Sequence, residues 1–479
     1  MSGPTLSPDA EPMSTTSPPE QPTKVRYGVL GFACSLSMIT YLDRVCFGKA
    51  APEMAKELGY NGAADLWPAM TSFTVAYAVF EVPSGWLGDV YGPKRTLMRI
   101  VLWWSLFTAL TGTVSAAMGG LALLVLIRFL FGVGEAGAYP NLTRALHNWL
   151  PPGQRGFGQG MVWMCGRFMG GLTPLIWLVV TVTFGLHWRA AFYLFGATGI
   201  VWCFWFWYWF RDQPHEHPAV NAAEVQLIEA GRLDIGHAHA NVPWKRLLTS
   251  GNLWCLCLMY FCAAYGWYFN ITYLPEFLEI EYGVGRADVL GQVYAGGPLL
   301  FGAMTCLIGG VLSDWFIRRT GNRRLGRRLF GVIGHSLCAL CYALCILRPS
   351  LIGFVLAISM AAFWNDLTMG ASWATCQDIG KKYAAIVAGC MNTIGNLGGA
   401  AANAVTGLIV KAQQNSVAGG SEAFKALSPE ARRELLWPAY QINFVIFAAV
   451  YLVAVLLWLR VDATKPVLPE AEGHSVTTP

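Results

Sequence analysis

The sequence predicts an all-α membrane protein of twelve transmembrane helices, arranged as two six-helix halves that repeat each other. Three observations support this fold class: an apolar composition, twelve apolar segments long enough to cross a bilayer, and motifs of the first half that recur in the second. Of the 479 residues, 55% are hydrophobic and 13% are charged, whereas a soluble domain carries about 25% charged residues. The net charge of +5 does not indicate a nucleic-acid partner, because the basic residues lie in short loops between apolar segments.

Two polar tails and a central linker divide the chain. Residues 1–26, rich in Pro, Ser and Thr, are expected to form a disordered cytoplasmic tail. A six-helix half at 27–211 is followed by a cytoplasmic linker at 212–250, a second six-helix half at 251–460 and a disordered cytoplasmic tail at 461–479. The expected spans are 27–48, 66–88, 96–116, 119–142, 156–183, 188–210, 251–275, 287–314, 327–347, 351–375, 383–411 and 437–460.

The basic residues set the expected orientation. Lys94, Arg95, Arg155 and Lys381 all lie in loops that follow even-numbered spans, as does the arginine-rich segment 318–328. Because positively charged loops stay on the cytoplasmic side, both termini are expected in the cytoplasm. The expected location is the plasma (inner) membrane. We expect a monomer embedded in the lipid bilayer.

Two ionisable residues interrupt the apolar fourth span. Arg128 and Glu135 each cost roughly 2.5–3.5 kcal/mol in the middle of a transmembrane helix. They are seven positions apart, so they project from one helical face. Gly132 and Gly134 between them allow a neighbouring helix or a ligand to come close. This pattern indicates a polar cavity, with a structural Arg–Glu pair between two helices as the alternative.

Motifs of the first half recur in the second. Gly85–Asp89 (GWLGD) ends the second span and Gly310–Asp314 (GVLSD) ends the eighth, and a basic loop follows each. Gly166–Gly171 in the fifth span is echoed by Gly395–Gly399 in the eleventh. Two related six-span halves are typical of secondary transporters, whose substrate site lies at the midplane between the halves.

The segment from Gly85 to Leu97 resembles the signature loop of the major facilitator superfamily. With the second copy at Gly310–Asp314, the resemblance extends over residues 27–460. It implies the major facilitator fold, transport by alternating access, and a latch between the two halves on the cytoplasmic side. The residues implied as gating residues are Gly85, Asp89, Arg95, Gly310 and Asp314.

Other segments resemble the anion:cation symporter family. They are Tyr41–Arg44 (YLDR), the stretch from Arg128 to Pro140, and the stretch from Asn392 to Asn396. Members of that family include bacterial hexuronate, galactonate and phthalate permeases and the phosphate and vesicular glutamate carriers of animals. The resemblance implies that Arg44 contacts a substrate carboxylate, and that Asp43 and Glu135 couple transport to protons.

Three arginines are candidates for anion binding. Arg stays charged and offers a planar donor fork that matches a carboxylate, so Arg44 and Arg128 are expected to bind substrate at similar depth. Arg167 stands where sugar-acid permeases of the family tend to carry Gln or Glu, and a third cation favours a dianion or a differently shaped acid. Its alternative role is an ion pair with Asp366 or Glu135. Asp366, inside the tenth span, is a further candidate for proton coupling.

Three polar residues complete the predicted site. Tyr77 aligns with a tyrosine that lines the cavity of the family, although packing is an equal alternative. Asn392 and Asn396 lie one helical turn apart on one face, where they either bind hydroxyls of a sugar acid or hydrogen-bond a neighbouring helix.

The sequence therefore predicts a secondary transporter that imports an organic anion, such as a hexuronate, aldonate or aldarate, by proton symport. An exporter or exchanger, or a carrier of an aromatic or other carboxylate, is the alternative, and a membrane sensor without transport is a remote one. No nucleotide loop, catalytic triad or convincing metal-ligand pattern is visible, so neither an enzyme nor a metal site is expected. The only expected cofactor is the coupling proton.

Overall fold

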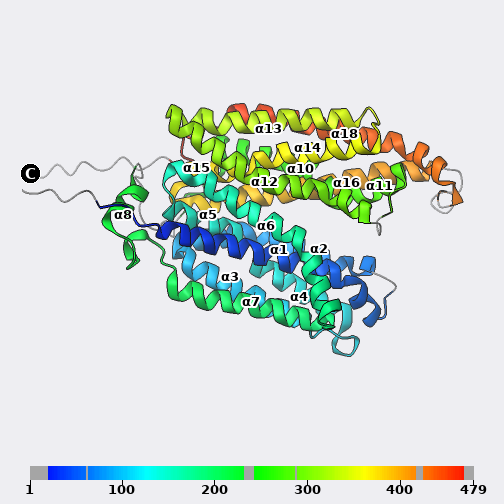
Figure 1. Cartoon of the computed structure of the whole chain (residues 1–479), viewed down its shortest axis with the longest axis horizontal. Helices are drawn as coiled ribbons and strands as arrows, with labels where there is room; N and C mark the ends of the chain where they lie inside the picture. The colour runs from blue at the N-terminus through cyan, green and yellow to red at the C-terminus, as the bar shows by residue number, and fades with distance from the viewer. Residues whose placement is uncertain are drawn as a thin grey trace, which may run out of the picture.

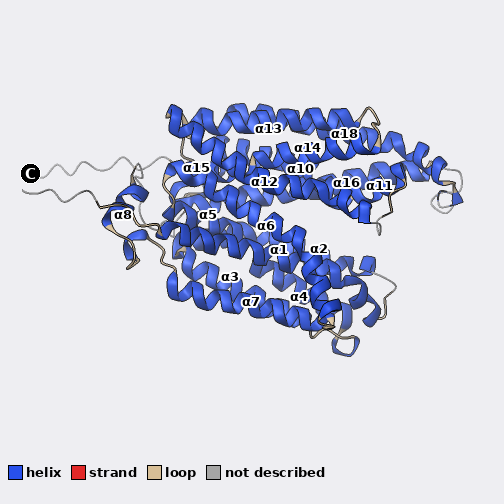
Figure 2. Ribbon diagram, in the orientation of Figure 1, coloured by secondary structure: helices blue, strands red, loops and turns tan. Residues whose placement is uncertain are grey.

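The computed structural model describes residues 20–60, 63–230, 242–285, 289–416, 424 and 426–468. Within these ranges the regular structure is entirely helical (Figure 2). When three broken helices are each counted as one span, the described residues form the twelve spans that the sequence predicts.

The helices of the first half are α1 (Val25–Glu57), α2 (Trp67–Tyr91), α3 (Pro93–Thr111), α4 (Gly120–Glu135) continued by α5 (Ala138–Trp149), α6 (Arg155–Leu178) and α7 (Trp188–Trp209). The linker holds α8 (Ala222–Glu229) and α9 (Trp244–Leu248). The helices of the second half are α10 (Gly251–Thr272) continued by α11 (Leu274–Tyr282), α12 (Val289–Thr320), α13 (Arg323–Cys345), α14 (Leu351–Leu367) continued by α15 (Met369–Gly380), α16 (Ala384–Asn415) and α18 (Pro429–Arg460). Short single-turn helices are η1 (Ala63–Leu66), η2 (Ala116–Met118), η3 (Pro152–Gln154), η4 (Val179–Thr183), η5 (Pro214–Glu216) and η6 (Lys381–Tyr383).

Length and apolar composition alone identify seven helical segments of the described chain that can cross a membrane, or up to eight with the bent pair at 152–183. One of these segments, Leu351–Asn415, contains both the tenth and the eleventh span. Some of the other spans carry buried charges, as α2 does with Glu81 and Asp89. Such charges weaken the apolar signal and mark positions that face protein or a cavity rather than lipid.

The two halves lie side by side with their helices roughly parallel (Figure 1). Helix α6 packs against α12, and α2 packs against α16, so these two pairs form much of the interface. The linker helix α8 and the described ends of the chain lie at one end of the bundle, which we call the terminal end.

Both predicted tails are partly ordered, contrary to expectation. Glu224 of α8 accepts hydrogen bonds from the backbone N–H groups of Val25 and Arg26, both at 3.2 Å. These N–H groups belong to the first turn of α1, where N–H groups have no acceptor within the helix. The Glu224 carboxylate supplies the missing hydrogen-bond acceptor. At the other end of the chain, the N–H of Val467 donates to the carbonyl of Ile379 at 2.9 Å. The rest of both tails, and residues 231–241 of the linker, lie outside the described residues.

The break between α4 and α5 has a steric cause. Gly137 adopts a left-handed conformation with φ of 86°, which a residue with a side chain rarely adopts. A Cβ atom there would also lie 2.4 Å from the side chain of Ser84 on α2. The break places Glu135 at the C-terminal end of α4, with its side chain 1% exposed.

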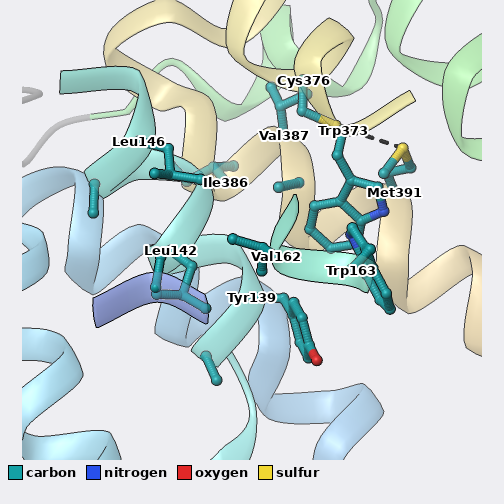
Figure 3. Packing of buried hydrophobic residues seen from close by; sticks show 14 of the residues in the cluster. Tyr139, Leu142, Leu146, Val162, Trp163, Trp373, Cys376, Ile386, Val387 and Met391 are labelled. Carbon is teal, nitrogen blue, oxygen red and sulfur yellow. Dashed lines mark hydrogen bonds between the residues drawn. The ribbon is translucent and has the colours of Figure 1, made fainter. Parts of the chain in front are cut away.

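An apolar cluster seals the interface on the terminal side of the midplane. Figure 3 shows Tyr139 and Trp163 of the first half facing Trp373 of the second. The Tyr139 and Trp163 rings stack with centroids 4.5 Å apart, and those of Trp163 and Trp373 are 5.1 Å apart. Leu146 and Ile386 extend this contact toward the terminal end. Large, close-packed rings exclude water from this part of the interface.

Candidate functional site

A cavity of about 90 Å³ lies between the halves, bordered by the aromatic cluster. A single water needs about 10–15 Å³ measured in this way, so the space admits several water-sized groups. The first half lines it with Tyr41, Arg44, Tyr77, Tyr139, Trp163 and Arg167. The second half contributes mainly aromatic and amide side chains, namely Tyr260, Trp267, Tyr268, Asn365, Asn392 and Asn396.

Arg44 of α1 holds Glu135 at the cavity wall. Its Nε donates to Oε1 of Glu135 at 2.5 Å, and its guanidinium carbon lies 4.8 Å from the centre of the Tyr77 ring. The Arg44 side chain is 31% exposed, whereas Glu135 is enclosed. Since α1 extends to Glu57 rather than ending near residue 48, Arg44 lies well inside the helix and not near its outer end. Glu135 uses neither of the two terminal nitrogens of Arg44. Nη2 is buried without a hydrogen bond, and the side chain lines the cavity, where its guanidinium can meet an anion.

Arg167 forms the ion pair that the sequence left as an alternative, and it also lines the cavity. Its Nη2 donates to Oδ1 of Asp366 at 2.9 Å, and both side chains are buried. Asn365 donates to the same oxygen at 3.1 Å, and the Arg167 guanidinium lies 4.4 Å from the centre of the Trp267 ring. The pair joins α6 to α14, so it crosses the interface between the halves.

Arg128 and Asp43 lie behind the cavity wall. The Arg128 guanidinium packs against the rings of Phe47, Phe73 and Phe131, with its carbon 4.2–4.7 Å from their centres. Asp43 is 4% exposed, and neither carboxyl oxygen has a hydrogen-bond partner within the described chain. Arg128 therefore does not reach the cavity beside Arg44. Its guanidinium is instead buried within the first half.

Glu81 of α2 is a buried acid that was not among the predicted site residues. Its Oε1 accepts from Nδ2 of Asn392 at 2.5 Å, and its Oε2 accepts from the hydroxyl of Thr393 at 3.3 Å. Glu81 is fully buried. Glu135 was identified because it is an acid inside an apolar span. Glu81, four residues after Tyr77, carries the same signal.

A second polar contact sits one turn further along α16. Oδ1 of Asn396 accepts from the Tyr268 hydroxyl at 3.4 Å, while its Nδ2 is buried without a hydrogen bond. Tyr77 and both asparagines therefore border the cavity, as the sequence analysis expected of site residues. The asparagines also make the interhelical contacts that were the alternative.

The predicted latch residues of the first half meet α16 at the terminal side. Asp89 accepts from the N–H groups of Ala385 and Ile386 at 3.1 and 2.8 Å. These N–H groups open a helix, where an anion is favoured. A Cβ on Gly85 would lie 2.6 Å from the Ala385 carbonyl oxygen, so glycine permits the close approach. Arg95 is exposed and does not join this contact; Arg144 of α5 lies there instead, with its Nε 3.8 Å from Asp89.

The second copy of the motif makes the matching contact. Asp314 pairs with Arg327 at 2.9 Å and accepts from the N–H of Phe157 in α6 at 2.7 Å. A Cβ on Gly310 would lie 2.1 Å from the carbonyl oxygen of Gly156. Close contacts at both pseudo-equivalent seams join the halves on the terminal side of the cavity.

A family model and several relatives all identify this chain as similar to transporters of one superfamily. A model of the Major Facilitator Superfamily matches residues 33–403. The "probable sulfoacetate transporter" of Cupriavidus necator is 33% identical over 393 residues, covering 82% of this chain and 89% of that protein. The "probable galactarate/D-glucarate transporter" of Escherichia coli is 28% identical, covering 82% and 88%. The hexuronate transporter of Bacillus subtilis is 26% identical, covering 81% and 89%.

Solved structures share the fold. A proton:xylose symporter of the major facilitator superfamily superposes with a TM-score of 0.66 at 13% identity, covering 92% of this chain and 96% of that one. The human organic anion transporter MFSD10 gives a TM-score of 0.62 at 14% identity, covering 92% and 100%.

Proposed function

The chain belongs to the major facilitator superfamily and to its anion:cation symporter family, and we propose that it imports a sugar acid together with protons by alternating access. It is an organic anion transporter and not an enzyme. The observation that carries the proposal is the Arg44–Glu135 pair, because it puts one cation at the cavity wall and one enclosed acid directly behind it.

An anion that enters the cavity competes with Glu135 for Arg44. If the substrate carboxylate takes the guanidinium, Glu135 stays enclosed without its counter-charge, and an unpaired buried charge costs several kcal/mol. Uptake of a proton removes that charge. The position of Glu135 at the C-terminal end of α4 acts in the same direction, since that end of a helix disfavours negative charge. Substrate and proton therefore favour each other's binding in one cavity.

The charges around the cavity support symport over simple anion uptake. The charged residues that line or adjoin it in the described chain are three arginines, Arg44, Arg128 and Arg167, and four acids, Asp43, Glu81, Glu135 and Asp366. With all seven ionised their sum is already negative, so an added anion is repelled until one or more acids bind protons.

The two arginines at the cavity wall favour an acid with two anionic groups. Arg44 comes from α1 and Arg167 from α6, so each can approach a different end of an elongated substrate. Relatives named for galactarate/D-glucarate and for sulfoacetate support this choice, because those compounds carry two acidic groups. The amides and tyrosine hydroxyls that line the cavity suit the hydroxyls of an aldarate.

The proposed orientation determines which side of the cavity is closed in this structure. If the terminal end is cytoplasmic, as the basic loops predict, the seams at Asp89 and Asp314 close the cytoplasmic side of the cavity. They must open for release. We propose on this basis that the protein lies in the inner membrane with both termini in the cytoplasm.

Uptake into proteoliposomes tests the proposal. The panel is galactarate, galacturonate, gluconate, sulfoacetate and benzoate, each with and without an acidic exterior and with the membrane potential clamped. We expect accumulation of at least one aldarate or hexuronate only when the exterior is acidic. Accumulation that ignores the pH gradient, or transport of benzoate alone, would contradict the proposal.

A further inference from the structure

Glu81 lies between the cavity and the seam, and nothing above assigns it a part in contacting the substrate. It comes from the first half, and both of its hydrogen-bond partners, Asn392 and Thr393, come from the second. Of these partners Asn392 also lines the cavity. An enclosed acid thus holds a side chain that a substrate can touch.

The carboxylate determines which end of the Asn392 amide faces the substrate. An amide side chain has two N–H donors at one end and an oxygen acceptor at the other, whereas both oxygens of Glu81 act as acceptors, from Asn392 and Thr393. Glu81 therefore takes the nitrogen end, as observed. The oxygen end of Asn392 is turned away from Glu81, and within the described chain Oδ1 of Asn392 has no hydrogen-bond donor.

Of the two asparagines on this face of α16, only Asn392 has an unoccupied oxygen. The oxygen of Asn396 is already occupied by the Tyr268 hydroxyl, and its nitrogen is buried. Both arginines at the cavity wall offer donors only. Asn392 consequently supplies an unoccupied acceptor in a site otherwise suited to carboxylates, and an acceptor recognises a hydroxyl.

We propose that Glu81 is a positioning residue for substrate selection, which fixes the Asn392 amide with its oxygen toward the cavity so that it accepts a hydrogen bond from a substrate hydroxyl. The inference rests on the proposed function and narrows it to hydroxylated acids. An acid of the same length without hydroxyls leaves the Asn392 oxygen unpaired, which disfavours its binding.

A purely structural role for Glu81 makes a different prediction. The backbone of Glu81 also lies against α16, since a Cβ on Gly389 would be 3.2 Å from the Glu81 carbonyl oxygen. If Glu81 serves only to join α2 and α16, its loss weakens binding of every substrate by the same factor. If it positions Asn392, its loss affects only substrates that carry the hydroxyl.

Galactarate and adipate form the matched pair of probes, because they are six-carbon dicarboxylates with and without hydroxyls. Gluconate and hexanoate form the corresponding monocarboxylate pair. Binding is measured by titration calorimetry on the purified full chain in nanodiscs, for the parent, Glu81→Met, Glu81→Gln and Asn392→Leu. Met keeps the approximate length of Glu without a strong acceptor, and Gln keeps an acceptor while adding a donor.

We expect the parent to prefer the hydroxylated acid, and Glu81→Met to reduce that preference about tenfold, the usual effect of one hydrogen bond. Adipate affinity should change less than twofold, and Glu81→Gln should give an intermediate preference. Asn392→Leu should cause the same loss, with no further loss when Glu81→Met is added to it. Should Glu81→Met not fold, the ratio of galactarate to adipate affinity in Glu81→Gln and in Asn392→Leu still tests the positioning role.

An unchanged preference in the Glu81 variants, with both acids weakened equally, overturns the positioning role and leaves the proposed function intact. A parent that prefers adipate or hexanoate also overturns it. A parent that binds none of the four acids, yet transports another class of anion, overturns the proposed sugar-acid function itself.

Discussion

Replacing Glu135 by Gln should separate binding from proton-driven accumulation. The amide keeps the shape of Glu and an oxygen that accepts from Nε of Arg44, now 2.5 Å from the carboxylate, so the fold should survive. It cannot take up or release the coupling proton. The substrate also loses its competitor for the Arg44 guanidinium. Two opposite charges in contact attract each other by roughly 4 kcal/mol at an effective dielectric constant near 20. Loss of even part of the attraction between Glu135 and Arg44 should therefore tighten anion binding by roughly tenfold.

The size of the transport effect follows from the proton gradient. One pH unit stores about 1.4 kcal/mol per coupled proton, which drives about tenfold accumulation. With the membrane potential clamped and the exterior one unit more acidic, the parent should accumulate substrate about tenfold for each coupled proton. Glu135→Gln should lose the tenfold factor that its own proton supplies, which leaves the substrate near equilibrium if one proton is coupled.

The assay compares counterflow and gradient-driven uptake in the same proteoliposomes. Counterflow needs only binding and alternating access, so Glu135→Gln should retain it. Glu53→Gln, an exposed acid toward the end of α1, is the matched control and should behave as the parent in both assays. If Glu135→Gln accumulates substrate on the pH gradient as the parent does, the coupling role must move to Asp43 or Asp366.

Three further predictions concern the arginines. Arg44→Lys should abolish substrate binding measured by calorimetry without lowering Tm by more than a few degrees, because a point charge cannot replace a two-pronged contact; unchanged affinity would exclude the carboxylate contact. Arg128→Ala should act mainly on folding, since it leaves a cavity among three rings and removes a cation close to Asp43, which costs about 3–5 kcal/mol and should appear as a large fall in Tm. A stable Arg128→Ala protein that has lost only binding would instead place Arg128 at the substrate. Arg167→Gln should shift preference in competition assays from dicarboxylates to monocarboxylates; loss of folding with an unchanged ranking would show that Arg167 serves only as the partner of Asp366.

The fold was predictable because its signals are local. Apolar length, Gly-rich motifs and the repetition of Gly85–Asp89 at Gly310–Asp314 are all readable along the chain. The resemblance to the anion:cation symporter family also put Arg44 at the substrate, and the structure has Arg44 at the cavity wall.

Partners in space were less predictable than positions in the sequence. Seven-residue spacing put Arg128 and Glu135 on one face of a regular helix, but it could not show that Phe47 and Phe73 enclose Arg128 while Arg44 reaches Glu135. Which acid pairs with Arg167 depended on the relative depth of α6 and α14, which loop lengths do not determine.

The latch shows the same limit. The resemblance of the signature loop named Arg95 among the gating residues, whereas the seam contains Arg144, which no motif singled out. The reason is geometric: the break after α4 lets α5 run along α2 and α16, and this brings Arg144 to Asp89.

The contacts of α2 connect the substrate site to the latch through one helix face. Glu81, Gly85 and Asp89 are four residues apart, so they form a single stripe, and this stripe lies along α16 from Asn392 to Ala385. If the terminal side opens by movement of α2 away from α16, the contacts of Asp89 and Gly85 with the start of α16 break together. That movement also stretches the 2.5 Å bond between Glu81 and Asn392. The Asn392 amide then loses the partner that fixed its orientation, so we expect the hydroxyl contact to weaken as the exit path forms. Substrate would thus be held most firmly while the seam is closed and released as it opens.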